Sequence, residues 1–114
     1  MKYRFYPAAD VAQDLIWRYT KKSWGEDQAD KYITELHNHV ARLADDRNLW
    51  LRLPKELVVP ADLEMEAYFS KYEHHYIFFR ELPDCVIGVM SILHEKMDIP
   101  VRLNHDLAKL ASQK

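Results

Sequence analysis

The feature that most constrains this fold is a nearly continuous apolar run, Val86–Leu93, in the last third of the chain. Polar residues hardly alternate with apolar ones in it, which is typical of a strand covered on both faces. Such a strand lies inside a sheet, so the chain must supply neighbouring strands and a covering layer. We expect helices to form one cover and leave open whether a partner forms the other.

The residues before this run predict its neighbours in an antiparallel sheet. His75–Leu82 is dense in Tyr, Ile and Phe, and the following Pro83-Asp84-Cys85 has the chemistry of a turn, so a hairpin is expected. Apolar and polar residues alternate from Leu63 to Phe69, which predicts a further strand with one wet face. Together these segments predict a three-stranded antiparallel meander.

Two amphipathic helices are expected before the meander. Between Ala8 and Ser23, apolar side chains recur at three- and four-residue steps, so this helix should bury one face. The residues of that face are Ala8, Val11, Ala12, Leu15, Ile16 and Tyr19. The second helix continues to about Asp46, with an apolar face of Ala29, Ile33, Leu36, Val40 and Leu43 flanked by Tyr32. Gly25 predicts a tight turn between the two helices, and Glu26-Asp27 are expected to cap the second.

The remaining segments complete an α+β fold. Lys2–Tyr6 predicts an N-terminal strand that stops at Pro7, which has no amide hydrogen to donate. Arg47–Asp62 contains two prolines and predicts a partly packed connection without a regular element. Beyond Pro100, leucines at helical spacing predict a short helix that either caps the core or contacts a partner.

The chain has 114 residues, so we expect a single domain over 1–114. Its architecture should be an N-terminal strand, an antiparallel helical hairpin and then the antiparallel meander. The strands should form one twisted sheet packed against the helices.

Composition excludes several classes of function. The formal net charge is -2 with both signs interspersed, so broad or sequence-specific nucleic-acid binding is not expected. Only two glycines occur, Gly25 and Gly88, which rules out a Gly-rich phosphate loop, a dinucleotide fingerprint and a nucleophile elbow. A lone Cys85 forms no intramolecular disulfide, and no apolar stretch approaches the roughly 20 residues that span a membrane. We expect a cytoplasmic protein without a membrane partner.

The six histidines do not predict a metal site. His37 and His39 should point to different sides of a helix, and the adjacent His74 and His75 should point to opposite sides of a strand. No cofactor and no metal are therefore expected.

Four groups of residues, spread over most of the chain, resemble the ParE toxins of the ParE/RelE superfamily. They are Asp14-Leu15-Ile16-Trp17 with Tyr19-Thr20; Trp24-Gly25 with Gln28-Ala29 and Tyr32; Tyr76-Ile77-Phe78-Phe79-Arg80; and Ile92-Leu93-His94-Glu95-Lys96-Met97-Asp98. Between Asn48 and Leu63 the chain departs from the family, whose approach to the second strand is usually shorter, Arg-rich and Gly-containing.

The resemblance implies the toxin of a type II toxin-antitoxin system. Such a toxin is neutralised by a partly disordered, ParD-like antitoxin in a hetero-oligomer and, once free, inhibits DNA gyrase without catalysis. The candidate partner-binding residues are Trp17, Trp24, Arg80, His94, Lys96 and Met97. Two alternatives stay open: a RelE-like ribosome-dependent mRNA endoribonuclease, and a ParE-like binding protein that has lost its toxicity.

RNA cleavage needs a general base, a general acid and cations that stabilise phosphate charge. Arg80, His94 and Lys96 are the residues placed to supply them, but each has a structural explanation or lacks support from the overall charge. His94 fits a strand-end histidine bonded to the backbone, and Arg80 fits an ion pair with Glu81 or Asp98. We therefore expect no catalytic residues. Trp17 and Trp24 are either core anchors or exposed contacts.

Overall fold

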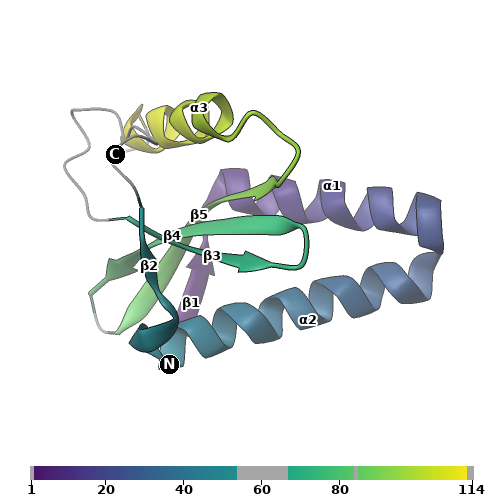
Figure 1. Ribbon diagram of the computed structural model, residues 1–114, viewed down its shortest axis with the longest axis horizontal. Helices are drawn as coiled ribbons and strands as arrows, with labels where there is room; N and C mark the ends of the chain where they lie inside the picture. Colours follow the sequence, from purple (N-terminus) through teal and green to yellow (C-terminus); the bar gives the residue numbers. More distant parts are fainter. Residues whose placement is uncertain (1, 54–66, 84, 113–114) are drawn as a thin grey trace.

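The computed structural model in Figure 1 has an α+β fold built on one mixed, five-stranded sheet. It describes residues 2–53, 67–83 and 85–112. In chain order the elements are β1 (Lys2–Phe5), α1 (Pro7–Trp24), α2 (Glu26–Asp45), the 3-10 turn η1 (Arg47–Leu49), β2 (Leu51–Arg52), β3 (Tyr68–Tyr72), β4 (His75–Leu82), β5 (Val86–His94) and α3 (Ile99–Ser112).

The strands lie in the order β1-β5-β4-β3-β2. The neighbours β3, β4 and β5 pair antiparallel, which confirms the predicted meander and its hairpin. The N-terminal strand joins the other side of β5 in parallel, in a register that runs from Lys2 opposite Val86 to Phe5 opposite Val89. Strand β5 is therefore inside the sheet, as its apolar run requires.

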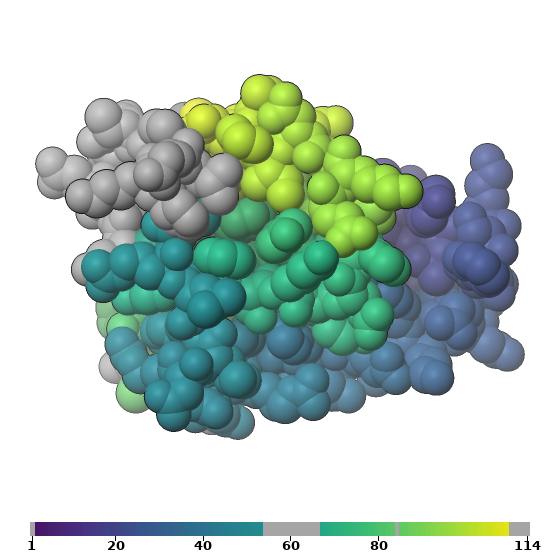
Figure 2. Space-filling view, in the orientation of Figure 1, coloured from purple at the N-terminus to yellow at the C-terminus, as the bar shows by residue number. Residues whose placement is uncertain are grey.

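Both faces of β5 are buried by helices of the same chain. Its Ile87, Val89 and Ile92 pack in the core cluster that contains the buried residues of α1 and α2. Its Met90 and Leu93 pack in a second cluster with residues of α3. The second cover, left open on the sequence alone, is therefore α3, and no partner is needed to complete it. In Figure 2, strand residues lie between α3 and α2 on the visible face.

A bulge in β5 adds a contact between the sheet and α3. The pairing of β4 with β5 shifts between Phe78 and Phe79, which lie opposite Ser91 and Val89, so Met90 is the additional residue. The hydroxyl of Ser91, which is fully buried, donates a 2.6 Å hydrogen bond to a carboxylate oxygen of Asp106 in α3. The bulge thus lets two successive residues, Met90 and Ser91, face the same helix.

Two sequence expectations about the middle of the chain are wrong in detail. The strand expected at Leu63–Phe69 runs instead from Tyr68 to Tyr72, while residues 63–66 lie outside the described residues. The connection expected to lack regular elements contains η1 and the edge strand β2, although 54–62 also lie outside the described residues. Trp50 explains why regular elements form here, because its side chain holds this segment against the sheet and α2. Its ring packs on Tyr68 and Phe79, and its indole N–H donates to a carbonyl oxygen of α2 at 2.6 Å.

The helical hairpin forms as predicted around Gly25. Its φ of 98° is in the region that favours glycine, and its amide donates to the Lys21 carbonyl at 2.9 Å to end α1. The predicted capping role of Glu26 and Asp27 is wrong, because Gly25 itself occupies the cap position of α2 without a side-chain hydrogen bond. The two acids lie in the first turn, where they still complement the helix dipole. The hairpin projects beyond the end of the sheet (Figure 1).

The expected burial of the apolar face of α1 is only partly correct. Ile16 is buried, whereas Val11 and Leu15 are each 58% exposed and Tyr19 is 71% exposed. The reason is that α1 packs on the sheet through a narrower stripe than its apolar residues occupy. Ala9 and Thr20 complete the buried set of α1, so one side of the predicted face is left facing solvent.

We predict that Gly88→Ala destabilises the fold. A Cβ atom at this position in β5 would lie 2.6 Å from Cε1 of Tyr6 and 3.0 Å from Cδ1 of Leu82, so both neighbours would have to move. Overpacking of this kind costs about 1–3 kcal/mol of unfolding free energy. Urea denaturation should show a lower midpoint than for the wild type, whereas the control Ser23→Ala, at an exposed site in α1, should not. Equal midpoints for Gly88→Ala and the control would contradict this packing.

Candidate functional site

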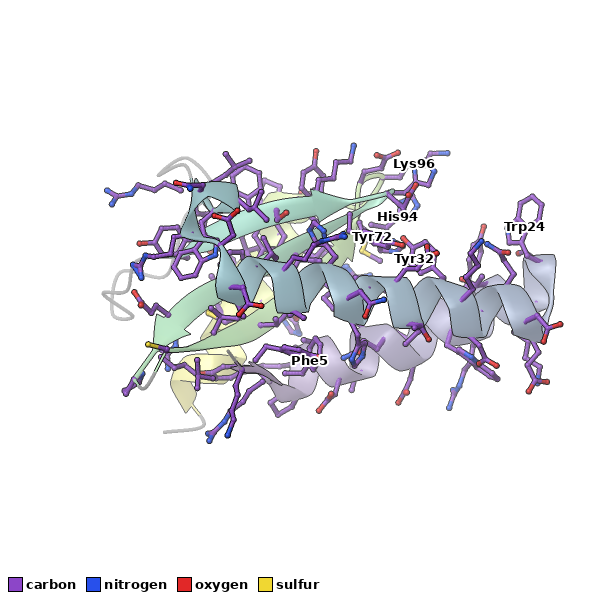
Figure 3. All side chains as sticks on the ribbon, turned by 90° about the horizontal axis from the view of Figure 1, so that it is seen from below. Phe5, Trp24, Tyr32, Tyr72, His94 and Lys96 are labelled. Carbon is purple, nitrogen blue, oxygen red and sulfur yellow. The ribbon has the colours of Figure 1, made fainter. Side chains whose placement is uncertain are left out.

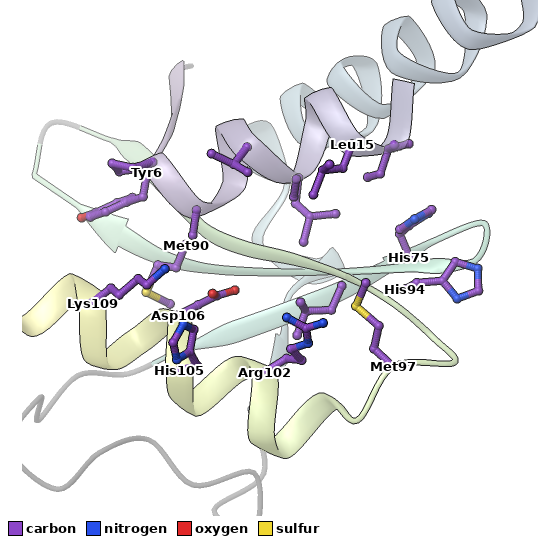
Figure 4. Close-up of a pocket in the computed structure, with 17 residues that line it drawn as sticks. Tyr6, Leu15, His75, Met90, His94, Met97, Arg102, His105, Asp106 and Lys109 are labelled. Atoms are coloured by element: carbon purple, nitrogen blue, oxygen red, sulfur yellow. The ribbon is translucent and has the colours of Figure 1, made fainter. Parts of the chain in front are cut away.

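The exposed side of α1 borders a long groove. One half, the narrow half, lies between α1 and α3 and encloses about 380 Å³. The other half, the wider half, lies between the helical hairpin and the end of the sheet where β4 begins and β5 ends, and it encloses about 900 Å³. Both halves are lined by the same five residues, Leu15, Ile16, His75, His94 and Met97, so we treat them as one site, the α1 groove. Figure 4 shows the first half, with α1 along one side and α3 along the other.

The α1 groove has an apolar wall. Val11, Leu15 and Tyr19 recur at four-residue steps along α1 and are all largely exposed. Met97, beyond the end of β5, adds another exposed apolar side chain, at 44%. Exposed apolar residues that gather along a hollow are typical of a surface that binds another molecule.

The groove begins where β1 ends. Pairing of β1 with β5 stops at Phe5 opposite Val89, because the chain turns at Pro7 into α1. Strand β5 continues to His94, and among the described residues no strand lies beside this last part on the side away from β4. Its Met90, Ile92 and Leu93 are buried and form the floor.

The wall that α3 contributes is polar. Arg102, His105, Asp106 and Lys109 line the narrow half of the groove from this helix (Figure 4). Asp106 is already engaged by the Ser91 hydroxyl. The wall thus combines two basic side chains, one imidazole and one carboxylate that holds α3 in place.

Three histidines form a cluster in the groove: His75 and His94 line both halves, and His74 lines the wider half alone. The rings of His75 and His94 meet edge to face with centroids 5.0 Å apart, and those of His74 and His94 are stacked at 6.2 Å. The backbone N–H of Lys96 donates to Nδ1 of His94 at 3.1 Å. In neutral His94 the ring hydrogen is therefore on Nε2. The expectation of a strand-end histidine bonded to the backbone is confirmed.

The pKa of His75 is lowered to about 4, first by burial and then by the neighbouring His94 and His74, while Glu95 acts in the opposite direction. Its Nδ1 shares a 2.7 Å hydrogen bond with the hydroxyl of Tyr32, whose own pKa is raised to about 12, mainly by burial. Near neutral pH, His75 is uncharged and Tyr32 keeps its proton. Near the junction of the two halves, His75 and Tyr32 therefore present side chains that are polar but carry no charge.

An ion pair stabilises the rim of this cluster. Glu95 accepts from Lys71 at 2.8 Å and lies 3.1 Å from Nδ1 of His74. The hydrogen bond from Lys71 is the main reason why the pKa of Glu95 is lowered to about 2. Glu95 therefore stays ionised over the pH range in which His75 titrates.

Four of the six candidate residues line the α1 groove: Trp24, His94, Lys96 and Met97. Figure 3 shows Lys96 and His94 near Tyr32 at the end of the sheet, with Trp24 out at the tip of the helical hairpin. Trp24 is 75% exposed, which settles the choice between a core anchor and an exposed residue for this side chain.

The other two candidates, Trp17 and Arg80, lie outside the lining of the groove. Trp17 is half-buried, and its indole N–H donates to Asp30 at 2.8 Å. The guanidinium of Arg80 donates to the Tyr6 hydroxyl at 2.8 and 3.1 Å. Glu81, one of the expected partners of Arg80, binds Arg47 instead, so that pairing was predicted wrongly.

The three residues considered for RNA cleavage do not come together. Arg80 lies opposite Gly88 near one end of the β4–β5 hairpin, whereas His94 lies opposite His75 at the other end. Lys96 follows His94 and shares its end of the sheet. At about 3.3 Å per residue along a strand, Arg80 and His94 are too far apart to act on one phosphate.

Several groove residues were missed or misplaced by the sequence analysis. Val11, Leu15 and Tyr19 were expected in the core, because an apolar face at helical spacing is the usual pattern of burial and does not show how much of that face the sheet covers. Arg102, His105 and Lys109 were not considered, although their spacing places them on one side of a helix. His75 was considered only as a metal ligand.

Two further properties concern the described residues alone. Within them, no group of three or more His, Cys, Asp or Glu side chains is arranged to hold a metal ion. None of their helices is both long and apolar enough to cross a membrane. The different sides of α2 expected for His37 and His39 are confirmed, because His37 contacts Gln13 and His39 contacts Ser70.

We predict that His75 makes stability depend on pH. Its pKa is about 4 in the folded chain and near 6.5 when unperturbed, so the unfolded chain binds the proton more readily between these values. The contribution of His75 to the unfolding free energy should therefore be complete above about pH 6.5 and decrease as the pH falls towards 4.

The substitution His75→Gln removes this titration, so it should lessen the loss of stability measured by urea denaturation at neutral pH and at about pH 4. The control His105→Gln, at an exposed imidazole of α3 away from the cluster, should behave as wild type. An unchanged pH dependence in His75→Gln would show that another group is responsible.

Comparison with known proteins is consistent with this fold. Residues 3–99 match the family model described as "ParE toxin of type II toxin-antitoxin system, parDE". Toxin ParE of Escherichia coli is 36% identical over 97 residues, which cover 83% of this chain and 87% of that protein. Toxin ParE1 of Mycobacterium tuberculosis, in strains CDC 1551 / Oshkosh and H37Rv, is 29% identical over 98 residues, covering 86% of this chain and 93% of that protein. The resemblance found in the sequence motifs is confirmed, and this chain belongs to the ParE toxin family of type II toxin-antitoxin systems.

Proposed function

We propose that this chain is a cytoplasmic, single-domain toxin whose α1 groove binds a cognate, ParD-like antitoxin, and which inhibits DNA gyrase without catalysis once it is free. The observation that carries the antitoxin site is the exposed apolar wall of Val11, Leu15 and Tyr19 beside the part of β5 that, within the described residues, has no strand on its side away from β4. Membership of the ParE family supports the existence of an antitoxin.

The two halves of the groove suit different segments of one bound chain. The narrow half lies beside the part of β5 that β1 does not reach, which favours an extended segment. The wider half is bordered by Tyr19, Trp24 and Met97, which favours the apolar face of a helix. A partly disordered antitoxin can fill both, because folding on the surface lets it cover a long site.

The candidate residues have distinct roles in this proposal. Trp24 and Met97 offer apolar anchors, because large exposed side chains of this kind contribute most when a partner removes them from water. His94 offers polar contacts at the junction of the two halves, and Lys96 offers them in the wider half. Trp17 and Arg80 are engaged by Asp30 and Tyr6, so we assign them no contact in the groove.

We predict that Leu15→Glu greatly weakens antitoxin binding. Leu15 belongs to both halves of the groove, and a carboxylate there would lose its hydration against an apolar surface. Burial of a leucine contributes about 1.5–3 kcal/mol, so affinity should fall by about tenfold or more. The protein encoded by a neighbouring gene for a small, acidic, partly disordered chain is the partner to measure, by calorimetry.

The control for this experiment is Thr34→Glu, which adds the same charge at an exposed position of α2 outside the groove. It should bind the antitoxin as wild type does. Equal affinities for the Leu15 and Thr34 variants would remove the α1 groove as the antitoxin site.

The proposed target is tested with two assays on the purified chain. We predict inhibition of gyrase-catalysed supercoiling, relieved by the antitoxin, and no ribosome-dependent cleavage of mRNA. The separation of Arg80 from His94 supports the second expectation. Cleavage that disappears in His94→Ala or Arg80→Ala would overturn the non-catalytic proposal. Antitoxin binding without gyrase inhibition or growth arrest would identify a ParE-like protein that has lost its toxicity.

A further inference from the structure

We propose that the narrow half of the α1 groove binds an extended segment in which apolar and acidic residues alternate, with the acidic side chains turned towards Arg102 of α3. This inference rests on the proposed antitoxin site and adds the chemistry of the segment that occupies it.

The two walls of the narrow half have opposite characters. Every lining residue that α1 contributes is apolar: Pro7, Ala8, Val11, Ala12, Leu15 and Ile16. Those contributed by the part of α3 whose side chains are described are charged or titratable: Arg102, His105, Asp106 and Lys109. The acidic residues on the outer surface of α1, Asp10 and Asp14, are not among the lining residues. An occupant therefore meets hydrocarbon on one side and polar groups on the other.

The polar wall favours anionic side chains at Arg102. This side chain is exposed, and no hydrogen bond or ion pair engages its guanidinium among the residues that the structure describes. The one carboxylate in the wall, Asp106, is held by Ser91 at 2.6 Å and thereby fixed to β5. A guanidinium is well suited to bind a carboxylate through paired hydrogen bonds.

The position of the groove in the sheet explains why the occupant is extended. β1 stops at Phe5, and the groove lies beside the part of β5 that β1 does not reach, with α1 on one face of the sheet and α3 on the other. Successive side chains of an extended chain point in opposite directions, so alternate residues would contact α1 and α3. The volume of about 380 Å³ is small for a helix, whose diameter with side chains is roughly 10–12 Å.

The spacing of residues along α1 fits the same arrangement. Val11 and Leu15 are four residues apart, so they are separated by about 6 Å along the helix axis. Residues two apart in an extended chain are separated by roughly 6.6 Å. Two apolar side chains of the segment can therefore reach Val11 and Leu15, while the acidic residue between them faces α3.

Two synthetic peptides of identical composition test this inference on the full chain. In one, Val and Glu alternate; in the other, all Val residues precede all Glu residues. We expect the alternating peptide to bind about tenfold more tightly, measured by fluorescence anisotropy. Only its sequence places apolar side chains against α1 and acidic side chains against α3 along the same segment. Equal binding of the two peptides, or binding of neither, would overturn the inference.

A charge reversal locates the acidic contact. Arg102→Glu should lower the affinity for the alternating Val-Glu peptide by about tenfold and should bind an alternating Val-Lys peptide more tightly instead. The affinity of Arg102→Gln for the Val-Glu peptide should lie between those of the wild type and Arg102→Glu. Lys31→Glu, an equal change of charge at an exposed position of α2 outside the groove, is the matched control and should leave both affinities unchanged. Circular dichroism checks that each variant is folded.

The outcomes separate this inference from the proposed function. If Arg102→Glu binds the alternating peptide as wild type does, the charge contact is wrong, but the antitoxin can still occupy the groove through its apolar wall. Leu15→Glu could instead bind the antitoxin normally while Arg102→Glu still prefers the Val-Lys peptide to the Val-Glu peptide. In that case the groove binds such segments from a partner other than the antitoxin.

Discussion

The burial of β5 on both faces is the interaction on which the rest of the molecule depends. Ile87, Val89 and Ile92 hold the helical hairpin, and Met90 and Leu93 hold α3. Burial of each such side chain contributes about 1.5–3 kcal/mol, so the strand supplies a large share of the stability of the domain. Because both helical layers pack on the same strand, their separation is set by the sheet between them. The groove between α1 and α3 follows from this common support.

A second constraint decides where that groove opens. Pro7 begins α1 only one residue after the end of β1, so the first strand is too short to cover the whole of β5. If β1 continued, its residues would fill the place that the groove now occupies. The same turn brings Tyr6 against Gly88 and Arg80, so the closed end of this region is packed by aromatic and guanidinium groups. A sheet that is closed at one end and open at the other is a direct result of one proline position.

Much of the fold could be predicted because periodicity reports burial. The boundaries of β4 and β5, the turn at Gly25 and the α+β order follow from dense apolar runs and one glycine. The position of β3 could not be predicted in this way, because Tyr68–Tyr72 is stabilised by ring packing with distant residues such as Trp50, which alternation does not reveal. The parallel pairing of β1 with β5 likewise joins segments from opposite ends of the chain.

The candidate site was predicted less completely, for a related reason. Trp24, His94, Lys96 and Met97 were chosen by resemblance and do line the groove. Leu15 and Tyr19 were assigned to the core because a helical pattern shows which residues share a face but not how much of that face the sheet covers. Arg80 was grouped with His94 because the sequence places them on a strand and at a strand end, and only the strand register shows that they are at opposite ends of the hairpin.

The order of the groove walls along the chain has a consequence for synthesis. The wall formed by α1 emerges from the ribosome early, whereas α3 follows every strand of the sheet. A partly made chain can display the apolar side of α1, but it has no opposite wall against which a ligand could be held. Recognition that needs both walls is therefore restricted to polypeptides whose translation has passed α3, and incomplete products should escape it.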